Sequence, residues 1–115
     1  MRYKTQNALT KTCRRIFSGL CIYREVAFPD LTSDKGFLLR YDIAIPEVEI
    51  LVEYHGCAKF VKFVHKRLSS FKRARKHDAL KKAYAKHMGW VFVEFTARDN
   101  VRNESLVLKR IEDAC

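Results

Sequence analysis

Two acidic residues stand inside apolar segments of the chain, where a carboxylate is costly to bury. Asp42 lies within the apolar run 38–45, and Glu53 lies late in the apolar run 50–55. A buried carboxylate is stable only when it is paired with a cation, hydrogen-bonded or bound to a metal. Two such carboxylates within a few ångströms of each other suit a hard cation such as Mg²⁺ or Mn²⁺. His55 falls on the same strand face as Glu53, where its imidazole could contact a phosphate or a water molecule.

The same two acids also have a purely structural interpretation. Asp42 would then form an ion pair with Arg40 or Arg24, and Glu53 would be a solvated residue of an edge strand. Spacing alone does not favour the metal site over this interpretation.

Two further acids extend the set. Glu25 lies on an earlier predicted strand, where a neighbouring cation would explain it equally well. Asp78 is the one acid between Lys59 and Lys86. It is either a helix N-terminal residue, where acids are favoured, or a partner of the metal or the histidine. The chain has no Cys-x-x-Cys pair for zinc and no glycine-rich phosphate loop, so other kinds of site are not indicated.

These side chains need a folded α/β scaffold to position them. The connection Pro46-Glu47 suggests a tight hairpin, which would place Asp42 opposite residue 50 or 51, with Glu53 a diagonal step away. A basic, mostly helical stretch over 58–88 is expected in two pieces that join near 69–70. The remaining predicted elements are a helix over 7–20, strands over 21–28, 37–45, 47–55 and 90–95, a loop over 29–36, and a helix over 101–114.

Length and composition restrict the class of protein. The 115 residues, 48% of them hydrophobic, suffice for one domain with a single core, so we expect one domain over 1–115. Charges interrupt every apolar run before the ~20 residues that a membrane span needs, and no signal segment is evident. The four cysteines suggest free thiols in a reducing compartment, so we expect a cytoplasmic protein, bacterial or in a phage-infected host cell.

The charge of the chain indicates its partner. Lys and Arg number 23 against 13 acids, a net charge of +10. A small domain this basic attracts polyanions, and an excess this one-sided over 59–86 favours phosphate contacts. Double-stranded DNA is therefore the predicted partner. The residues predicted to bind it are Lys59, Lys62, Lys66, Arg67, Lys72, Arg73, Arg75 and Lys76.

Four short motifs occur in an order that resembles a known family. The chain is similar, over 21–96, to the very short patch repair endonuclease superfamily, part of the PD-(D/E)XK group. Its acids and histidine also follow the order of the EDxHD motif of a branch of phage homing endonucleases, as Glu25, Asp42, His55 and Asp78. The four motifs are Arg40–Pro46, Leu51–Cys57, Lys76–Ala79 and Gly89–Thr96.

The resemblance implies a fold and a metal site. The fold would be a restriction-endonuclease-like core of αβββαβα order, with a central mixed β-sheet flanked by helices. Asp42 would be the principal ligand of Mg²⁺ or Mn²⁺, and the backbone carbonyl of Tyr54 would be the second. Glu53 matches the second acid of the general PD-(D/E)XK pattern.

The resemblance also implies a reaction. His55 would stand where the wider group has its catalytic lysine, and Glu25 and Asp78 would orient water or complete the outer shell of the metal. The expected activity is Mg²⁺-dependent cleavage of DNA by a homing or phage-type endonuclease. Because 115 residues leave little room to read a long site, three alternatives stay open: the specificity module is absent, a homodimer supplies the reach, or the substrate is recognised by its shape. The alternatives are an inactive nucleic-acid-binding module on the same fold, a structure- or mismatch-specific repair nuclease, and a basic protein that binds an acidic protein.

Overall fold

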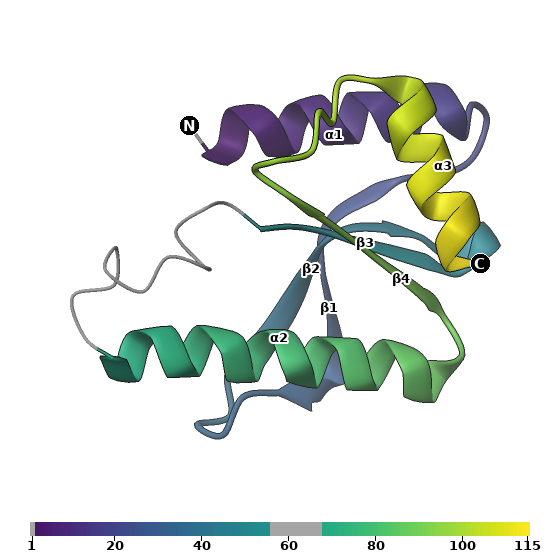
Figure 1. Cartoon of the computed structure of the whole chain (residues 1–115). Helices are drawn as coiled ribbons and strands as arrows, with labels where there is room; N and C mark the ends of the chain where they lie inside the picture. The colour runs from purple at the N-terminus through teal and green to yellow at the C-terminus, as the bar shows by residue number, and fades with distance from the viewer. Residues whose placement is uncertain (1, 56–67) are drawn as a thin grey trace.

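The computed structural model describes residues 2–55 and 68–115, with side chains over 5–55 and 72–115. A four-stranded sheet lies between two layers of helices, with α1 and α3 over one face and α2 over the other (Figure 1). The predicted order of helices and strands and the mixed sheet flanked by helices are confirmed. The elements are α1 (Arg2–Ile16), β1 (Tyr23–Thr32), β2 (Leu38–Ile45), the short 3-10 helix η1 (Pro46–Val48), β3 (Ile50–His55), α2 (Leu68–Met88), β4 (Val91–Thr96) and α3 (Glu104–Ala114).

The sheet places the strands that carry the acids at its centre. Its order is β1-β2-β3-β4, so β2 and β3 each have a neighbour on both sides. The first three strands are antiparallel, whereas β4 runs parallel to β3. A parallel neighbour needs a crossover, and the chain between β3 and β4 includes α2. Because helices cover both faces, the central strands are buried on both sides, which explains their nearly continuous apolar sequence.

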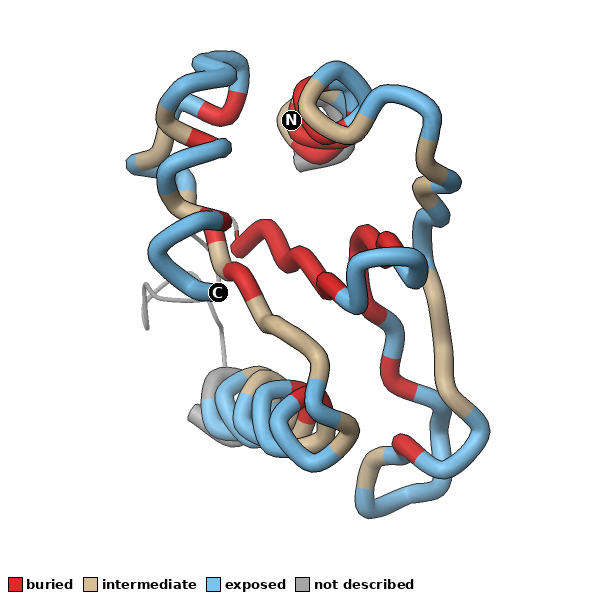
Figure 2. Tube along the Cα trace, turned by 90° about the vertical axis from the view of Figure 1, so that its right-hand side faces the viewer, coloured by how far each residue is buried: buried red, intermediate tan, exposed pale blue. Residues whose placement is uncertain are grey.

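Two hydrophobic clusters fill the space between the layers. Figure 2 shows buried residues gathered along the central strands and the inward faces of the helices. One cluster joins the sheet to α1 and α3, through residues such as Leu9, Val107 and Ile111. In this cluster, burial raises the pKa of the Cys13 thiol to about 12, so the thiol stays protonated and unreactive at neutral pH. The second cluster joins the sheet to α2, through residues such as Ala85.

The connection from β2 to β3 differs from the predicted tight hairpin. The chain forms η1, and Glu49 follows in the left-handed conformation with φ 54°, its N–H donating to the Pro46 carbonyl at 3.1 Å. Ile45 therefore pairs with Ile50 across a four-residue connection. The expected pairing of Asp42 with residue 50 or 51 is wrong, because the observed register continues to Glu53.

The first strand also differs from prediction. The predicted loop over 29–36 is wrong at its start, because β1 continues through Pro29 to Thr32. Proline is tolerated there since β1 is an edge strand, and the register is irregular between Ala27 and Thr32. The predicted last helix begins later than expected, at Glu104, where the side chain of Asn103 accepts a hydrogen bond from the Leu106 N–H at 3.2 Å.

None of the helices over 2–16, 68–88 and 104–114 has the length and apolar character required to cross a membrane. Cys13, Cys21 and Cys115 are free thiols, and Cys57 lies outside the described residues.

Asp99 links the end of β4 to α3 and gives a testable pH dependence. Its carboxylate accepts hydrogen bonds from Arg110 Nη2 at 2.7 Å and from the Thr96 N–H at 2.8 Å. Burial alone would raise the pKa of Asp99, but these bonds outweigh it and hold the pKa below its ordinary value. A carboxyl with a lowered folded-state pKa stabilises the protein above its unfolded pKa of about 3.9, and loses this effect as pH falls through the folded value.

We therefore expect Asp99→Asn to lower the free energy of unfolding by about 1–2 kcal/mol at pH 7. Urea unfolding of both proteins between pH 7 and pH 2 measures this difference, which should shrink towards zero at the acidic end. A difference that is the same at both ends of the range would contradict the assignment.

Candidate functional site

The two central acids lie side by side where the ladder between β2 and β3 ends. Backbone pairing extends as far as Ile43 with Val52. Beyond that pair, side chains take over the hydrogen bonds: the Asp42 N–H donates to Glu53 Oε1 at 3.0 Å, and the Tyr54 N–H donates to Asp42 Oδ2 at 2.8 Å. Both carboxylates are buried, at 7% and 1% exposure for Asp42 and Glu53 respectively. The expected juxtaposition of two buried carboxylates is therefore present.

Lys81 of α2 provides the counter-charge for Glu53. Its ammonium donates to Glu53 Oε2 at 2.8 Å and to the Arg40 carbonyl at 2.9 Å, and the lysine is itself buried. The interpretation of Glu53 as a solvated edge residue is thus wrong. Burial, reinforced by the negative charge of Glu53, raises the pKa of Tyr41 above its ordinary value. The Tyr41 hydroxyl thus stays protonated and donates to the Lys81 carbonyl at 2.6 Å.

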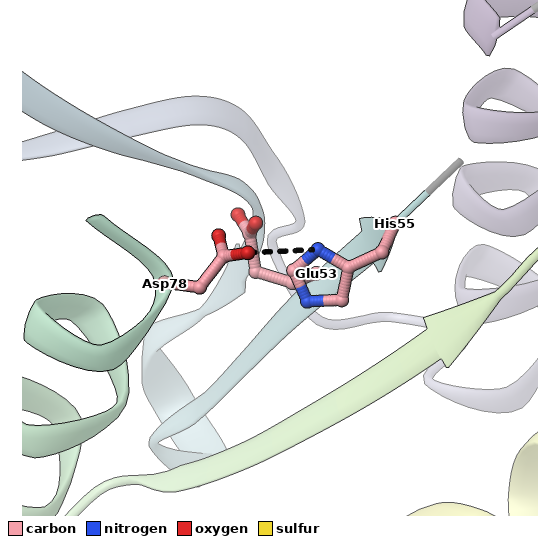
Figure 3. Close-up of side chains that lie close together, drawn as sticks. All are labelled: Glu53, His55 and Asp78. Atoms are coloured by element: carbon pink, nitrogen blue, oxygen red, sulfur yellow. Dashed lines mark ion pairs between the residues drawn. The ribbon is translucent and has the colours of Figure 1, made fainter. Parts of the chain in front are cut away.

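His55 lies between two carboxylates. Its Nε2 is 2.9 Å from Glu94 Oε2, and its Nδ1 is 3.8 Å from Asp78 Oδ2, a distance longer than a hydrogen bond. The imidazole is 1% exposed. Asp78 points from α2 towards His55 at the end of β3, with Glu53 beside them (Figure 3). Asp78 lies in the middle of α2, so its interpretation as a helix N-terminal acid is wrong.

Glu53, His55 and Asp78 form a group that could hold a metal ion. One potential ligand atom from each lies within 4.8 Å of the others. Two carboxylates and an imidazole form a mixed oxygen and nitrogen set, which suits Mn²⁺ better than Mg²⁺, because Mg²⁺ prefers oxygen ligands alone. Asp42 is not a member of this group. It is fixed next to it through its two hydrogen-bond connections with the Glu53-Tyr54 segment.

Glu25 lies opposite Asp42 on the neighbouring strand, but its carboxylate contacts α1. The pairing of β1 with β2 places Glu25 opposite Asp42, at a point where Glu25 has φ 55° in the left-handed region. Its exposed carboxylate accepts a hydrogen bond from Nε2 of the buried Gln6 at 3.2 Å. An amide therefore contacts the carboxylate, and a neighbouring cation is also present, because the Arg40 guanidinium donates to the Glu25 backbone carbonyl at 3.4 Å.

Sequence reasoning missed two residues of the site, Lys81 and Glu94. Glu94 pairs in parallel register with Glu53, so one row across the sheet carries an acid on every strand. The sequence feature that could have identified Glu94 is the two-residue alternation within 91–96, which places Glu94 on the same strand face as Phe92 and Thr96. The signal for Lys81 was its position three residues after Asp78, on the same side of a helix.

A small cleft of about 220 Å³ gives access to the site. Its lining includes Asp78 and Glu94, whose side chains are 19% and 37% exposed. Arg75 and Lys82, both exposed on α2, line the same cleft. The opening therefore combines two carboxylates of the site with two cations, an arrangement that suits a phosphate group next to a metal-binding centre.

Half of the predicted DNA-binding residues fall on α2. Each of these four is exposed, and Lys76 forms an ion pair with Asp34 of the β1–β2 turn. The residues on α2 are Lys72, Arg73, Arg75 and Lys76; Lys59, Lys62, Lys66 and Arg67 lie outside the described residues.

The chain was compared with known proteins. No family model matches it, and neither a curated protein nor a solved structure matches it.

Proposed function

We propose that this protein is a metal-dependent DNA endonuclease with a restriction-endonuclease-like core, of the homing or phage type. The observation that carries the proposal is the convergence of Glu53, His55 and Asp78 within 4.8 Å, next to buried Asp42 and beside the basic helix α2. The element order and mixed sheet agree with those that the resemblance to the very short patch repair superfamily implies.

The donor atoms fit a divalent cation. Glu53 and Asp78 contribute carboxylate oxygens and His55 an imidazole nitrogen, while Asp42 lies in contact with the same strand segment. A bound cation would stabilise the negative charge that develops on a phosphodiester and lower the pKa of an attacking water. Cleavage of DNA needs both effects, and a binding protein needs neither of them. A phosphate-binding face that served binding alone would favour neutral or basic residues.

The remaining residues have roles of their own in this proposal. His55 would hold the cation through the ring nitrogen that faces Asp78, while Glu94, 2.9 Å from Nε2, fixes the orientation of the ring. Arg75 and Lys82 hold the phosphate at the mouth of the cleft. The basic residues of α2 bind the flanking backbone, which makes binding strongly dependent on salt.

The test is incubation of the full chain with supercoiled plasmid in Mn²⁺, Mg²⁺ or chelator. We expect nicked or linear product with either metal, more of it with Mn²⁺, and none with chelator. Asp78→Asn should lower the rate by about 10²-fold or more, because it removes one of the two carboxylates of the proposed metal group. Asp113→Asn, which removes an exposed acid of α3, is the matched control and should cut at the wild-type rate.

Two outcomes would count against the proposal. If the protein slows the migration of plasmid in a gel but produces no cleaved product with either metal, the inactive binding module becomes the better hypothesis. If Asp78→Asn and Asp113→Asn cut equally fast, the reaction takes place elsewhere on the protein.

A further inference from the structure

A second hollow lies on the other flank of α2, between this helix and the β1–β2 turn. It has a volume of about 390 Å³, and its lining includes Phe37 and Leu38. Phe37 is 70% exposed and Leu38 is 47% exposed, so two neighbouring apolar side chains face solvent at the end of a hairpin. A turn favours small polar residues, and adjacent exposed apolar side chains in a hollow are typical of a binding surface.

Phe37 is presented on a well-defined turn. Its carbonyl accepts from the Ser33 N–H at 2.8 Å, and its own N–H donates to Ser33 Oγ at 3.2 Å. Gly36 occupies the left-handed region with φ 83°, which permits the tight reversal before Phe37. The ion pair of Asp34 with Lys76 ties the turn to α2. The aromatic ring therefore starts from a backbone that is already ordered, which lowers the entropic cost of binding.

The lining of this hollow is basic as well as aromatic. Lys35, Arg73, Lys76 and His77 contribute to it, and Asp34, the one acid among its described lining residues, is paired with Lys76. An aromatic side chain next to a positively charged groove is the combination with which proteins bind unpaired nucleotides, by stacking on the base and pairing with the backbone. An apolar peptide would need the aromatic surface but would gain nothing from the cations.

The two hollows face opposite flanks of one helix. Residues of α2 that differ by two positions lie about 200° apart around the helix axis, since each residue turns it by about 100°. Arg73 lines the hollow beside Phe37, and Arg75 lines the cleft beside Asp78. A nucleic-acid strand that crosses the outer surface of α2 therefore reaches both.

We propose that the hollow beside Phe37 binds an unpaired nucleotide of the DNA substrate, with its base stacked on Phe37. This inference deepens the proposed function and rests on it for the cleavage step. It names the substrate class: DNA that contains single-stranded or bulged nucleotides close to the cleaved phosphodiester. A fully paired duplex contacts the cations of α2 but offers no base to Phe37.

The experiment is a binding titration of the full chain in chelator, so that no cleavage takes place. Fluorescence anisotropy would compare a labelled single strand, a duplex of the same sequence and that duplex with a bulge of unpaired nucleotides. Phe37→Ser should weaken binding of the single strand and of the bulged duplex by roughly 5- to 150-fold, the effect of one lost stacking contact. Binding of the paired duplex should change by less than about 2-fold, and Phe37→Trp should restore the loss.

Val48→Ser is the matched control, because Val48 is 40% exposed in η1, at the opposite end of β2. It should leave all three affinities unchanged. Equal losses for the paired and unpaired ligands, or no loss with Phe37→Ser, would overturn the inference. The outcome is separable from that of the proposed function. Selective binding of unpaired nucleotides without any cleavage in metal would reject the nuclease and keep the nucleotide site. Cleavage in metal without selective binding would keep the nuclease and reject the nucleotide site.

Discussion

Replacement of Asp42 by asparagine is expected to lower the rate of metal-dependent plasmid nicking by about 10²- to 10⁴-fold. Asparagine has the same shape, and its amide oxygen can still accept the hydrogen bond from the Tyr54 N–H that Asp42 Oδ2 accepts at 2.8 Å. What it lacks is the negative charge next to the Glu53, His55 and Asp78 group. The loss of a carboxylate therefore removes several kcal/mol of interaction with a divalent cation while the backbone contacts are retained.

Two measurements separate this effect from damage to the fold. Single-turnover nicking with Mn²⁺ gives the rate, and urea unfolding in chelator gives the stability of the variant without metal. We expect the midpoint of unfolding to change little, and we expect Mn²⁺ to stabilise the wild type much more than Asp42→Asn. Nicking at the wild-type rate by a variant that still folds would show that Asp42 contributes nothing to the reaction.

The position of Asp42 illustrates what the sequence predicts and where it fails. Two acids in adjacent apolar strands predict a pair of buried carboxylates, and the structure contains that pair. The register was wrong because Pro46-Glu47 suggested a two-residue connection. The chain instead forms a four-residue connection, in which Glu49 has a left-handed backbone conformation. Residues other than glycine rarely adopt this conformation, so the sequence did not indicate it.

The partners of the buried residues Glu53 and His55 were harder to predict than these two residues themselves. Lys81 is 28 residues away from Glu53, and Glu94 is 39 residues away from His55. Both contacts depend on how α2 packs against the sheet and on the parallel pairing of β4 with β3. Local periodicity identifies helices and strands, but it does not specify which helical face meets which strand. Lys81 and Lys82 both lie at helical spacing from Asp78, so spacing alone does not specify which of the two lysines meets Glu53.

The order of the elements was predictable because turn-forming residues separate segments of helical or strand character along the chain. Boundaries failed where a residue tolerates more than one context. Pro29 usually ends a strand, yet on the edge strand β1 its missing N–H needs no partner. Glu25 lies opposite Asp42 in the register of β1 with β2, and no local pattern specifies its left-handed backbone or its contact with Gln6 of α1.

The buried pair of Lys81 with Glu53 gives the largest expected effect on stability. Lys81→Met should lower the free energy of unfolding by about 3–5 kcal/mol, because it leaves a carboxylate of 1% exposure without the ammonium at 2.8 Å. Chemical denaturation in chelator at neutral pH measures the loss. Lys82→Met, which changes the exposed neighbour on α2, is the matched control and should fall within about 0.5 kcal/mol of wild type.

A second substitution and a metal titration identify the cause of that loss. If the cost is the unpaired charge, Glu53→Gln in the Lys81→Met background should recover stability, with a coupling energy of about 1–3 kcal/mol. Mn²⁺ should also restore Lys81→Met, since a cation bound by Glu53, His55 and Asp78 replaces the missing ammonium, and saturation at 100 times its dissociation constant adds about 2.7 kcal/mol. A purely additive double variant that Mn²⁺ does not stabilise would mean that the lysine acts through packing of its aliphatic chain. A metal ion bound at Glu53 would then not substitute for the positive charge of Lys81.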